Sequence, residues 1–329
     1  MALDTSGFAA KRAAFVTPFY PSGLPATGMD VVEADPSTFA LPTGCASVSR
    51  YTISQPGGRT GGSVQYAYLL VPAHALSGTL LVFLPGHNNY GTGFDADYCY
   101  GDGSSVILAA LALGHWVLVV EMPATGYQPN PQTIRVGGTV VTVLAHYYAP
   151  LGVDGGPPAM RMFLDTIIRS LNQAITDLSP AHVYVAGHSG GGCINSVWGA
   201  CDARVERSVM MQGGMPEAFG PLYVATVDYE QAIFNPMYSR AWGDYGGIVT
   251  LGASFPNRRT IACGAGGDNT FCINPLASAP ASKYTEYWDD RQSLLPPGCV
   301  LQHYLGPITQ GHMPDPAECA VVMAFLAAP

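Results

Sequence analysis

The stretch VYVAGHSGGGCIN, residues 183–195, decides the fold of this chain. An apolar run typical of a strand leads into Ser189, which stands among glycines, and a helical pattern begins at Gly190. Small residues around a serine in such a turn allow the strand and the helix to approach closely. The turn is expected to lift the serine hydroxyl above a sheet, beside the unsatisfied amides and positive dipole end of the helix.

Strands and helices alternate along the rest of the chain. Apolar or alternating runs predict strands at 47–54, 64–72, 78–86, 115–123, 182–187 and 207–214, and at the starts of 258–271 and 300–316. Helical spacing predicts helices at 105–113 and 160–178, after Gly190, and near the C-terminus after Asp315. This β-α-β alternation indicates an α/β fold with a mostly parallel sheet, covered by helices on both faces.

The composition of the chain indicates how large a core it can bury and which kinds of partner it is unsuited to bind. The chain has 329 residues, of which 48% are hydrophobic and 11% charged, so we expect one large domain. Its formal charge is -9 with only two lysines, which argues against a nucleic-acid partner. It contains no run of 18 apolar residues, so we expect no membrane span. Residues 1–45 match no motif and are interpreted as an irregular N-terminal arm.

The N-terminal residues and the cysteines indicate in which cellular compartment the protein is expected. Residues 1–23 lack the regions of a signal peptide, so either the chain is intracellular as written or a signal was removed before Leu3. Eight cysteines suit disulfides in an oxidising compartment, and we expect a secreted or periplasmic protein, with an intracellular one as the alternative. Cys263 and Cys272 flank a loop and are the predicted disulfide, although several cysteines could be buried thiols. Zinc-ligand spacings are absent, so no metal is expected.

The strand, the Gly187–Gly191 turn and the order of elements resemble the α/β-hydrolase superfamily over residues 45–329. In that family a nucleophilic serine, an acid and a histidine follow one another along the chain. The resemblance implies that Ser189 is the nucleophile, that Asp268 is the acid and that His312 is the base, with no cofactor. Glu217 is the alternative acid, because some relatives use the position after the preceding strand.

The resemblance also implies an oxyanion hole. One donor is the backbone N–H of Gly190, directly after the nucleophile, and the other comes from the loop PGHNNYG after the third strand. We assign it to the N–H of His87, with Asn88 in reserve. His188 adjoins the serine but is expected to point away from it, so it is not the base, and we place it with Asn88 among the substrate-binding residues.

An aromatic-rich insertion at 214–258 is predicted to form a cap over the serine. Trp242 and Tyr238 are its expected substrate contacts, although its aromatic residues could instead pack a second small core. The insertion and its edge carry Arg240, Arg258 and Arg259, any of which could bind an anionic group.

Together these features predict a serine hydrolase that cleaves carboxylic esters through an acyl-enzyme. The strand VQYAYLLVPA is similar to the corresponding region of polyester depolymerases and feruloyl esterases, which implies apolar, aromatic or polymeric esters. One alternative is a carbon–carbon hydrolase that cleaves a β-diketone with the same triad. The other is a non-catalytic binding module, against which the intact serine, acid and histidine argue.

Overall fold

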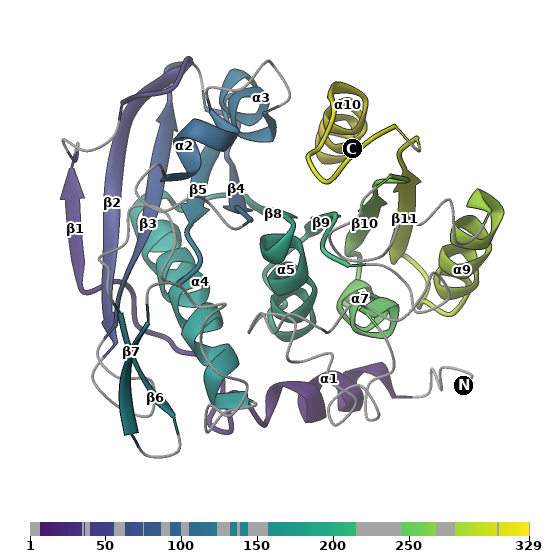
Figure 1. The fold of residues 1–329 in the computed structure, drawn as a ribbon, viewed down its shortest axis with the longest axis horizontal. Coiled ribbons are helices and arrows are strands. Elements are labelled where there is room, and N and C mark those ends of the chain that lie inside the picture. The colour runs from purple at the N-terminus through teal and green to yellow at the C-terminus, as the bar shows by residue number, and fades with distance from the viewer. Residues whose placement is uncertain are drawn as a thin grey trace.

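A nine-stranded sheet forms the centre of the molecule (Figure 1). The computed structural model describes residues 7–34, 36, 40–55, 63–74, 76–86, 93–99, 105–123, 132–136, 139–143, 157–214, 245–267, 280–307 and 309–328. In spatial order the sheet contains β1 (Val31–Ala34), β2 (Cys45–Gln55), β3 (Ser63–Pro72), β5 (Trp116–Val120), β4 (Thr79–Leu84), β8 (His182–His188), β9 (Arg207–Met211), β10 (Arg259–Gly264) and β11 (Val300–Leu305). A separate antiparallel pair consists of β6 (Gln132–Val136) and β7 (Thr139–Val143).

The six strands from β5 to β11 in this order are parallel, whereas β1, β2 and β3 pair antiparallel at one end. Parallel strands buried on both faces carry continuous apolar runs, and β4 shows the consequence. Its Leu80, Val82 and Leu84 pack into one apolar cluster. Its Leu81 and Phe83 pack into the other. The predicted mostly parallel sheet with two covered faces is therefore confirmed.

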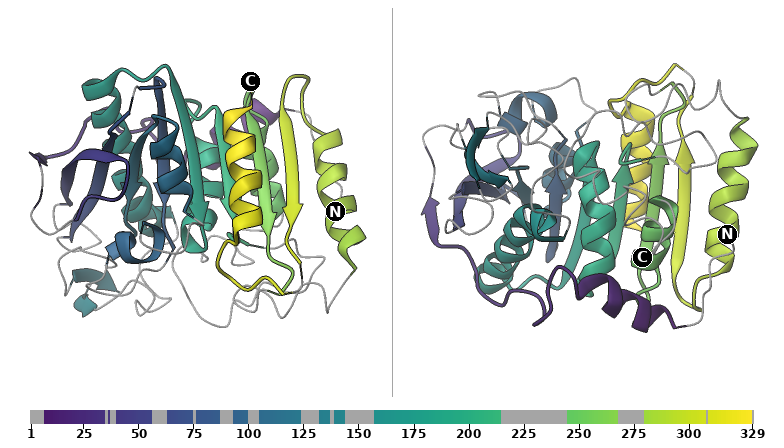
Figure 2. Two further views of the ribbon diagram at one scale, coloured as in Figure 1. Left: turned by 90° about the horizontal axis from the view of Figure 1, so that it is seen from above. Right: turned by 60° about the horizontal axis from the view of Figure 1, so that its bottom comes forward.

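Helices cover both faces of the sheet. The first cluster contains side chains of α1 (Phe8–Val16), α4 (Pro157–Leu178), α5 (Gly190–Cys201) and α7 (Tyr245–Ala253). The second contains side chains of α2 (Gly93–Tyr98), α3 (Val106–Ala112) and α10 (Pro316–Ala327), and α3 and α10 stand in front of the sheet in the left view of Figure 2. The C-terminal helix begins as predicted, because the Asp315 side chain accepts a hydrogen bond from the Glu318 amide at 2.8 Å.

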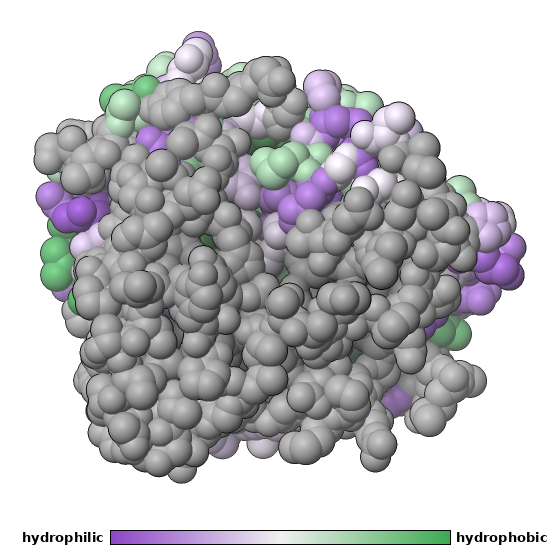
Figure 3. Space-filling view, viewed as in Figure 1, coloured by the Kyte–Doolittle hydropathy of each residue, from purple (hydrophilic) through white to green (hydrophobic). Residues whose placement is uncertain are grey.

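A further helix, α9 (Ala281–Ser293), lies beside β11 at the edge of the sheet. Tyr284 and Trp288, one helical turn apart, are buried, and their rings meet edge to face. The opposite side of α9 is polar, and hydrophilic residues cover it in Figure 3. Asp289 and Asp290 are exposed there, so they belong to a solvated helix face.

The N-terminal arm is not irregular as expected, because its apolar residues find partners on the body. Helix α1 buries Phe8 and Phe15 and crosses beneath α5 and α7 in the right view of Figure 2. Its Arg12 donates a hydrogen bond of 2.9 Å to the Ser254 carbonyl. Farther along, β1 pairs with β2 at the edge of the sheet.

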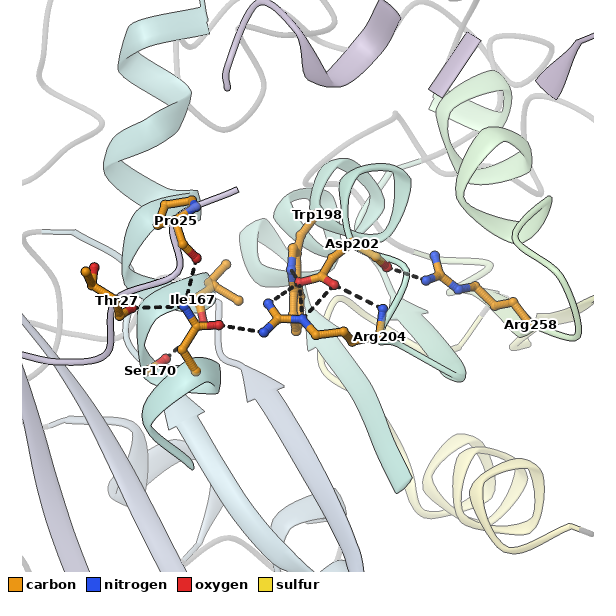
Figure 4. Close-up of polar contacts among 9 residues, drawn as sticks. Pro25, Thr27, Ile167, Ser170, Trp198, Asp202, Arg204 and Arg258 are labelled. Atoms are coloured by element: carbon orange, nitrogen blue, oxygen red, sulfur yellow. Dashed lines mark hydrogen bonds and ion pairs between the residues drawn. The ribbon is translucent and has the colours of Figure 1, made fainter. Parts of the chain in front are cut away.

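A partly buried polar network fastens the arm to the helix layer (Figure 4). Asn172 of α4 donates 2.8 Å to the carbonyl of Pro25 in the arm and accepts 2.5 Å from Arg204. Arg204 forms an ion pair of 2.5 Å with Asp202, which is 1% exposed. Burial alone would raise the pKa of Asp202, but the hydrogen bonds and charge of Arg204 lower it below its ordinary value of 3.8. Arg258 donates to the Asp202 carbonyl, so the network reaches the segment before β10.

Part of the predicted cap lies within the described residues, and that part belongs to the core. Residues 245–253 form α7, which packs against α5 on one face of the sheet. Tyr245 is 1% exposed and meets the ring of Trp288 edge to face. The guanidinium groups of Arg12 and Arg258 each lie 4.2 Å from the ring centre of Phe255. This part is therefore neither a cap nor a second small core, because its apolar side chains belong to the same cluster as those of β4, α4 and α5. Residues 215–244 lie outside the described residues.

The predicted Cys263–Cys272 disulfide is wrong. Cys263 lies inside β10 as a buried free thiol, and its side chain is hydrogen-bonded to Glu318. Burial raises the pKa of this thiol well above its ordinary value of 9.0. Cys272 lies outside the described residues. The expected disulfide therefore no longer argues for an oxidising compartment.

Two features are absent from the described part of the chain. None of its helices is long and apolar enough to cross a membrane. It also contains no group of three or more histidine, cysteine, aspartate or glutamate residues placed to hold a metal ion.

Backbone contacts between α5 and the sheet explain the glycines of the opening stretch. A Cβ atom on Gly191 would lie 2.1 Å from the Leu84 carbonyl oxygen, at the end of β4. One on Gly187 would lie 2.4 Å from the Gly191 carbonyl oxygen, and one on Gly192 would lie 2.9 Å from the Cα of Gly213. Helix α5 thus meets β4 and the β9 loop backbone to backbone, which only glycine permits.

We therefore expect Gly191→Ala to lower the free energy of unfolding by about 3 kcal/mol, because the new methyl group forces the helix away from β4. Urea denaturation followed by circular dichroism measures this loss. Gly199→Ala is the matched control on the same helix, since its Cβ would lie 3.7 Å from the nearest atom, the Ser208 Oγ. It should be neutral or stabilising by up to about 1 kcal/mol. Equal stability of the two variants would contradict the backbone-contact argument.

Candidate active site

Ser189 occupies a strained turn at the carboxyl end of β8. It joins β8 directly to α5, and its backbone angles are φ 55° and ψ -126°, which are rare for a residue with a side chain. The amide of Ser189 donates a hydrogen bond of 2.9 Å to the Met211 carbonyl at the end of the neighbouring β9. Its side chain makes no capping bond to α5, which leaves the hydroxyl for other partners.

His312 is the partner of that hydroxyl. Its Nε2 lies 2.7 Å from the Ser189 Oγ, a hydrogen bond between residues 123 positions apart in the chain. The histidine stands in the loop between β11 and α10 and is half-buried. The structure thus brings together two of the three predicted triad residues in the geometry that a serine nucleophile and its base require.

Several predicted site residues lie outside the described residues. They are Asp268, Glu217, His87, Asn88, Tyr238 and Trp242. The residue that precedes Asp268 is described, and its contacts place the loop after β10. Gly267, which precedes Asp268, donates its amide to the Gln310 carbonyl at 3.0 Å, two positions before His312. The loop after β10 is therefore attached to the loop that carries the histidine.

Gly190 is the first residue of α5. The first bond within this helix runs from the Cys193 amide to the Ser189 carbonyl, at 3.0 Å. The amides of residues 190–192 therefore have no acceptor within the helix, as is usual in a first turn. These donors and the helix dipole favour negative charge beside the serine. Gly190, a predicted oxyanion donor, directly follows Ser189 and carries one of these helix amides.

The loop after β4 packs directly on the nucleophile. A Cβ atom on Gly86 would lie 2.8 Å from the Cβ of Ser189, so this position tolerates only glycine at its present distance. The Gly86 amide donates 2.8 Å to the hydroxyl of Tyr98. It is therefore engaged within the protein, and an oxyanion donor from this loop has to come from a later residue.

The structure does not support His188 as a substrate-binding residue. Its side chain is 2% exposed, and both ring nitrogens have protein partners. Nδ1 lies 2.8 Å from the Tyr98 hydroxyl, and Nε2 lies 2.9 Å from the main-chain oxygen of His312. We correct the prediction because a ring enclosed in this way has no nitrogen left for a substrate.

Glu318 and Tyr98 are the residues of this region that the sequence patterns missed. Glu318 is fully buried in α10 and accepts hydrogen bonds from Gln212 at 2.6 Å and from Gln310. Gln212 follows β9 with φ 45°, and Gln310 precedes His312 by two positions. The carboxylate thus joins the end of β9 to the histidine loop. No local pattern marks these residues, since they meet only through the tertiary fold.

Comparisons with known proteins identify the architecture. No protein-family model matches the sequence, and no curated protein matches it. Solved structures do match: acetyl xylan esterase 1 from Thermoanaerobacterium sp. JW/SL YS485 has a TM-score of 0.56 at 15% identity, with coverage of 98% of this chain and 93% of that chain. Acetyl xylan esterase from Paenibacillus sp. R4 has a TM-score of 0.54 at 13% identity, with coverage of 98% and 94%. With its sheet order and strand–serine–helix turn, the chain has the fold of the α/β-hydrolase superfamily.

Proposed function

We propose that this protein is a serine hydrolase that cleaves carboxylic esters through an acyl-enzyme. The observation that carries the proposal is the 2.7 Å contact between the Ser189 hydroxyl and Nε2 of His312, with the serine held at φ 55°. Nucleophilic hydrolysis needs this pair, because a serine hydroxyl is unreactive until a base accepts its proton. The fold that the chain shares with two acetyl xylan esterases supports ester chemistry further.

The proposed reaction proceeds in two halves. Ser189 Oγ attacks the ester carbonyl carbon while His312 Nε2 accepts its proton, and the tetrahedral oxyanion is stabilised by the amides of Gly190 and His87. The carbon–oxygen bond to the leaving group then breaks, and His312 donates the proton to the departing alkoxide. Water next attacks the acyl-enzyme with His312 as base, which releases the carboxylic acid and restores the serine.

Asp268 is the proposed acid of the triad. A buried carboxylate on Nδ1 would fix the tautomer of His312 and stabilise its charged form. Support comes from Gly267, the preceding residue, whose amide is bonded to the Gln310 carbonyl in the histidine loop. Glu217 stays the alternative, since it follows β9 in sequence.

A neutral acyl group is the proposed substrate class, with apolar, aromatic or polymeric esters favoured, and Tyr238, Trp242 and Asn88 as its proposed contacts. An anionic group would lose hydration on burial and would need a cation as its partner. Arg258 does not supply one, because it is 1% exposed and donates to the carbonyls of Val205, Gly199, Gly252 and Asp202.

Ser189→Ala and His312→Ala should each lower kcat by about 10⁴-fold or more, because either change removes the activated nucleophile. A fluorophosphonate probe should form one adduct, on the peptide that contains Ser189, and mass spectrometry locates it. Ser196→Ala is the matched control on α5, since this buried serine donates only to the Cys193 carbonyl, at 2.6 Å. An adduct on another residue, or full activity of Ser189→Ala, would contradict the proposal.

Asp268→Asn should lower kcat by about 10⁴-fold while the fold stays intact, because an amide stabilises the wrong tautomer of the histidine. Steady-state kinetics and circular dichroism measure the two effects. Glu217→Gln is the paired variant and should keep near-normal turnover. The reverse result, with an active Asp268→Asn and an inactive Glu217→Gln, would reassign the acid.

The acyl preference should be graded, because one methylene in an apolar pocket is worth only about 1–3 kcal/mol. The measurement is kcat/KM for p-nitrophenyl acetate, butyrate and octanoate, a feruloyl ester, a polyester film and a β-diketone. We expect the longer or aromatic neutral esters to be cleaved best. Acetate cleavage with a sharp loss at butyrate would instead indicate a small pocket, and cleavage of the β-diketone alone would indicate the carbon–carbon hydrolase.

A further inference from the structure

A buried chain of hydrogen bonds runs behind the proposed nucleophile. The Gly86 amide donates 2.8 Å to the Tyr98 oxygen, which lies 2.8 Å from Nδ1 of His188. Nε2 of the same imidazole lies 2.9 Å from the main-chain oxygen of His312. These contacts join α2 to the loop after β4, the serine turn and the histidine loop. The proposed reaction uses neither Tyr98 nor His188.

The partners fix the direction of each bond. A main-chain carbonyl can only accept, so Nε2 of His188 carries the proton and donates it to His312. In the neutral imidazole Nδ1 is then an acceptor, and the Tyr98 hydroxyl donates to it. The Tyr98 oxygen keeps lone pairs for the Gly86 amide. Every bond in the chain is thus satisfied by a single tautomer of His188.

Packing holds both side chains in place. Tyr98 is 8% exposed and His188 is 2% exposed. The Tyr98 ring lies edge to face with Phe83 of β4, with centroids 5.1 Å apart, and edge to face with His188 at 5.8 Å. The ring of His188 lies 5.2 Å from that of His312. Buried and close-packed groups of this kind keep fixed positions, unlike exposed hydrogen-bonding side chains.

His312 needs such support because of where it stands. It belongs to the irregular segment between β11 and α10 and is half-buried, so no helix or strand fixes its backbone. Its imidazole must nevertheless stay at hydrogen-bond distance from the Ser189 hydroxyl. A bond to the main chain of His312 fixes the position of the residue and leaves its imidazole ring for proton transfer.

We propose that His188 and Tyr98 are positioning residues that hold His312 and the loop of Gly86 in register with Ser189. The inference rests on the proposed function, since it assigns the two residues to the support of that same nucleophile and base. Displacements of about 1 Å in a catalytic constellation cost up to about 10²-fold in rate. Loss of the His188 bond should therefore lower kcat by about 10- to 100-fold and leave KM within about threefold.

The test compares purified full-length variants by kcat, KM and the rate of fluorophosphonate labelling of Ser189. His188→Leu should show the full loss in kcat and a parallel loss in labelling rate. His188→Gln should recover most of the kcat and of the labelling rate, because the glutamine carboxamide N–H can reach the His312 carbonyl. Tyr98→Phe should show a smaller loss, and the double variant Tyr98→Phe/His188→Leu should lose less than the product of the two single losses.

His115→Gln is the matched control. This histidine is also buried, and its Nδ1 lies 2.7 Å from the hydroxyl of Ser77, but it stands just before β5, at the opposite end of the parallel strands from Ser189. Its substitution should leave kcat unchanged, whatever it costs in stability. Urea denaturation of every variant separates a loss of fold from a loss of positioning.

Two results would overturn the inference. One is normal kcat and labelling in a folded His188→Leu, and the other is equal losses in His188→Leu and His188→Gln. Either leaves the proposed function standing as long as Ser189→Ala is inactive. Failure of the proposed function appears separately, as absence of labelling at Ser189 in the unmodified protein.

Discussion

The contact between the backbone of α5 and the backbone of β4 is the constraint on which the rest of the structure depends. Because Gly191 has no side chain, the helix starts within van der Waals distance of the Leu84 carbonyl. The chain must then turn from strand to helix within one residue, and Ser189 takes the strained angles that this requires. Strain of this kind persists only where the surrounding packing enforces it.

The same constraint explains why the candidate site assembles at this edge of the sheet. All the parallel strands end here, so the loops after β4, β9, β10 and β11 converge on the serine turn. Each loop is attached to its neighbour by a specific bond rather than by regular structure. Gly267 is bonded to Gln310, and Glu318 joins Gln212 to Gln310. These bonds give irregular segments the fixed positions that chemistry needs.

Polar groups are buried on the opposite side of the molecule for a different purpose. Arg258 donates to backbone carbonyls at the ends of α5 and α7. Asp202 pairs with Arg204, whose bond to Asn172 links this cluster to the N-terminal arm. An arginine surrounded by carbonyls is a structural cation, since removing it would leave several acceptors unpaired. The position of Arg258 in the sequence therefore does not show that it binds substrate, because its partners in the fold are backbone carbonyls.

The sequence by itself determined the α/β architecture, the strand–serine–helix turn and the position of His312 after the last strand. These features are local: continuous apolar runs, glycines around one serine and an aspartate cap are legible in a few consecutive residues. Tertiary structure decided the rest. Partners distant in sequence decided four features: the regular structure of the N-terminal arm, the burial of α7 in the core, the free thiol of Cys263 and the enclosure of His188. Local patterns carry no information about such partners, because contacts between distant segments are fixed only when the sheet and its helices pack.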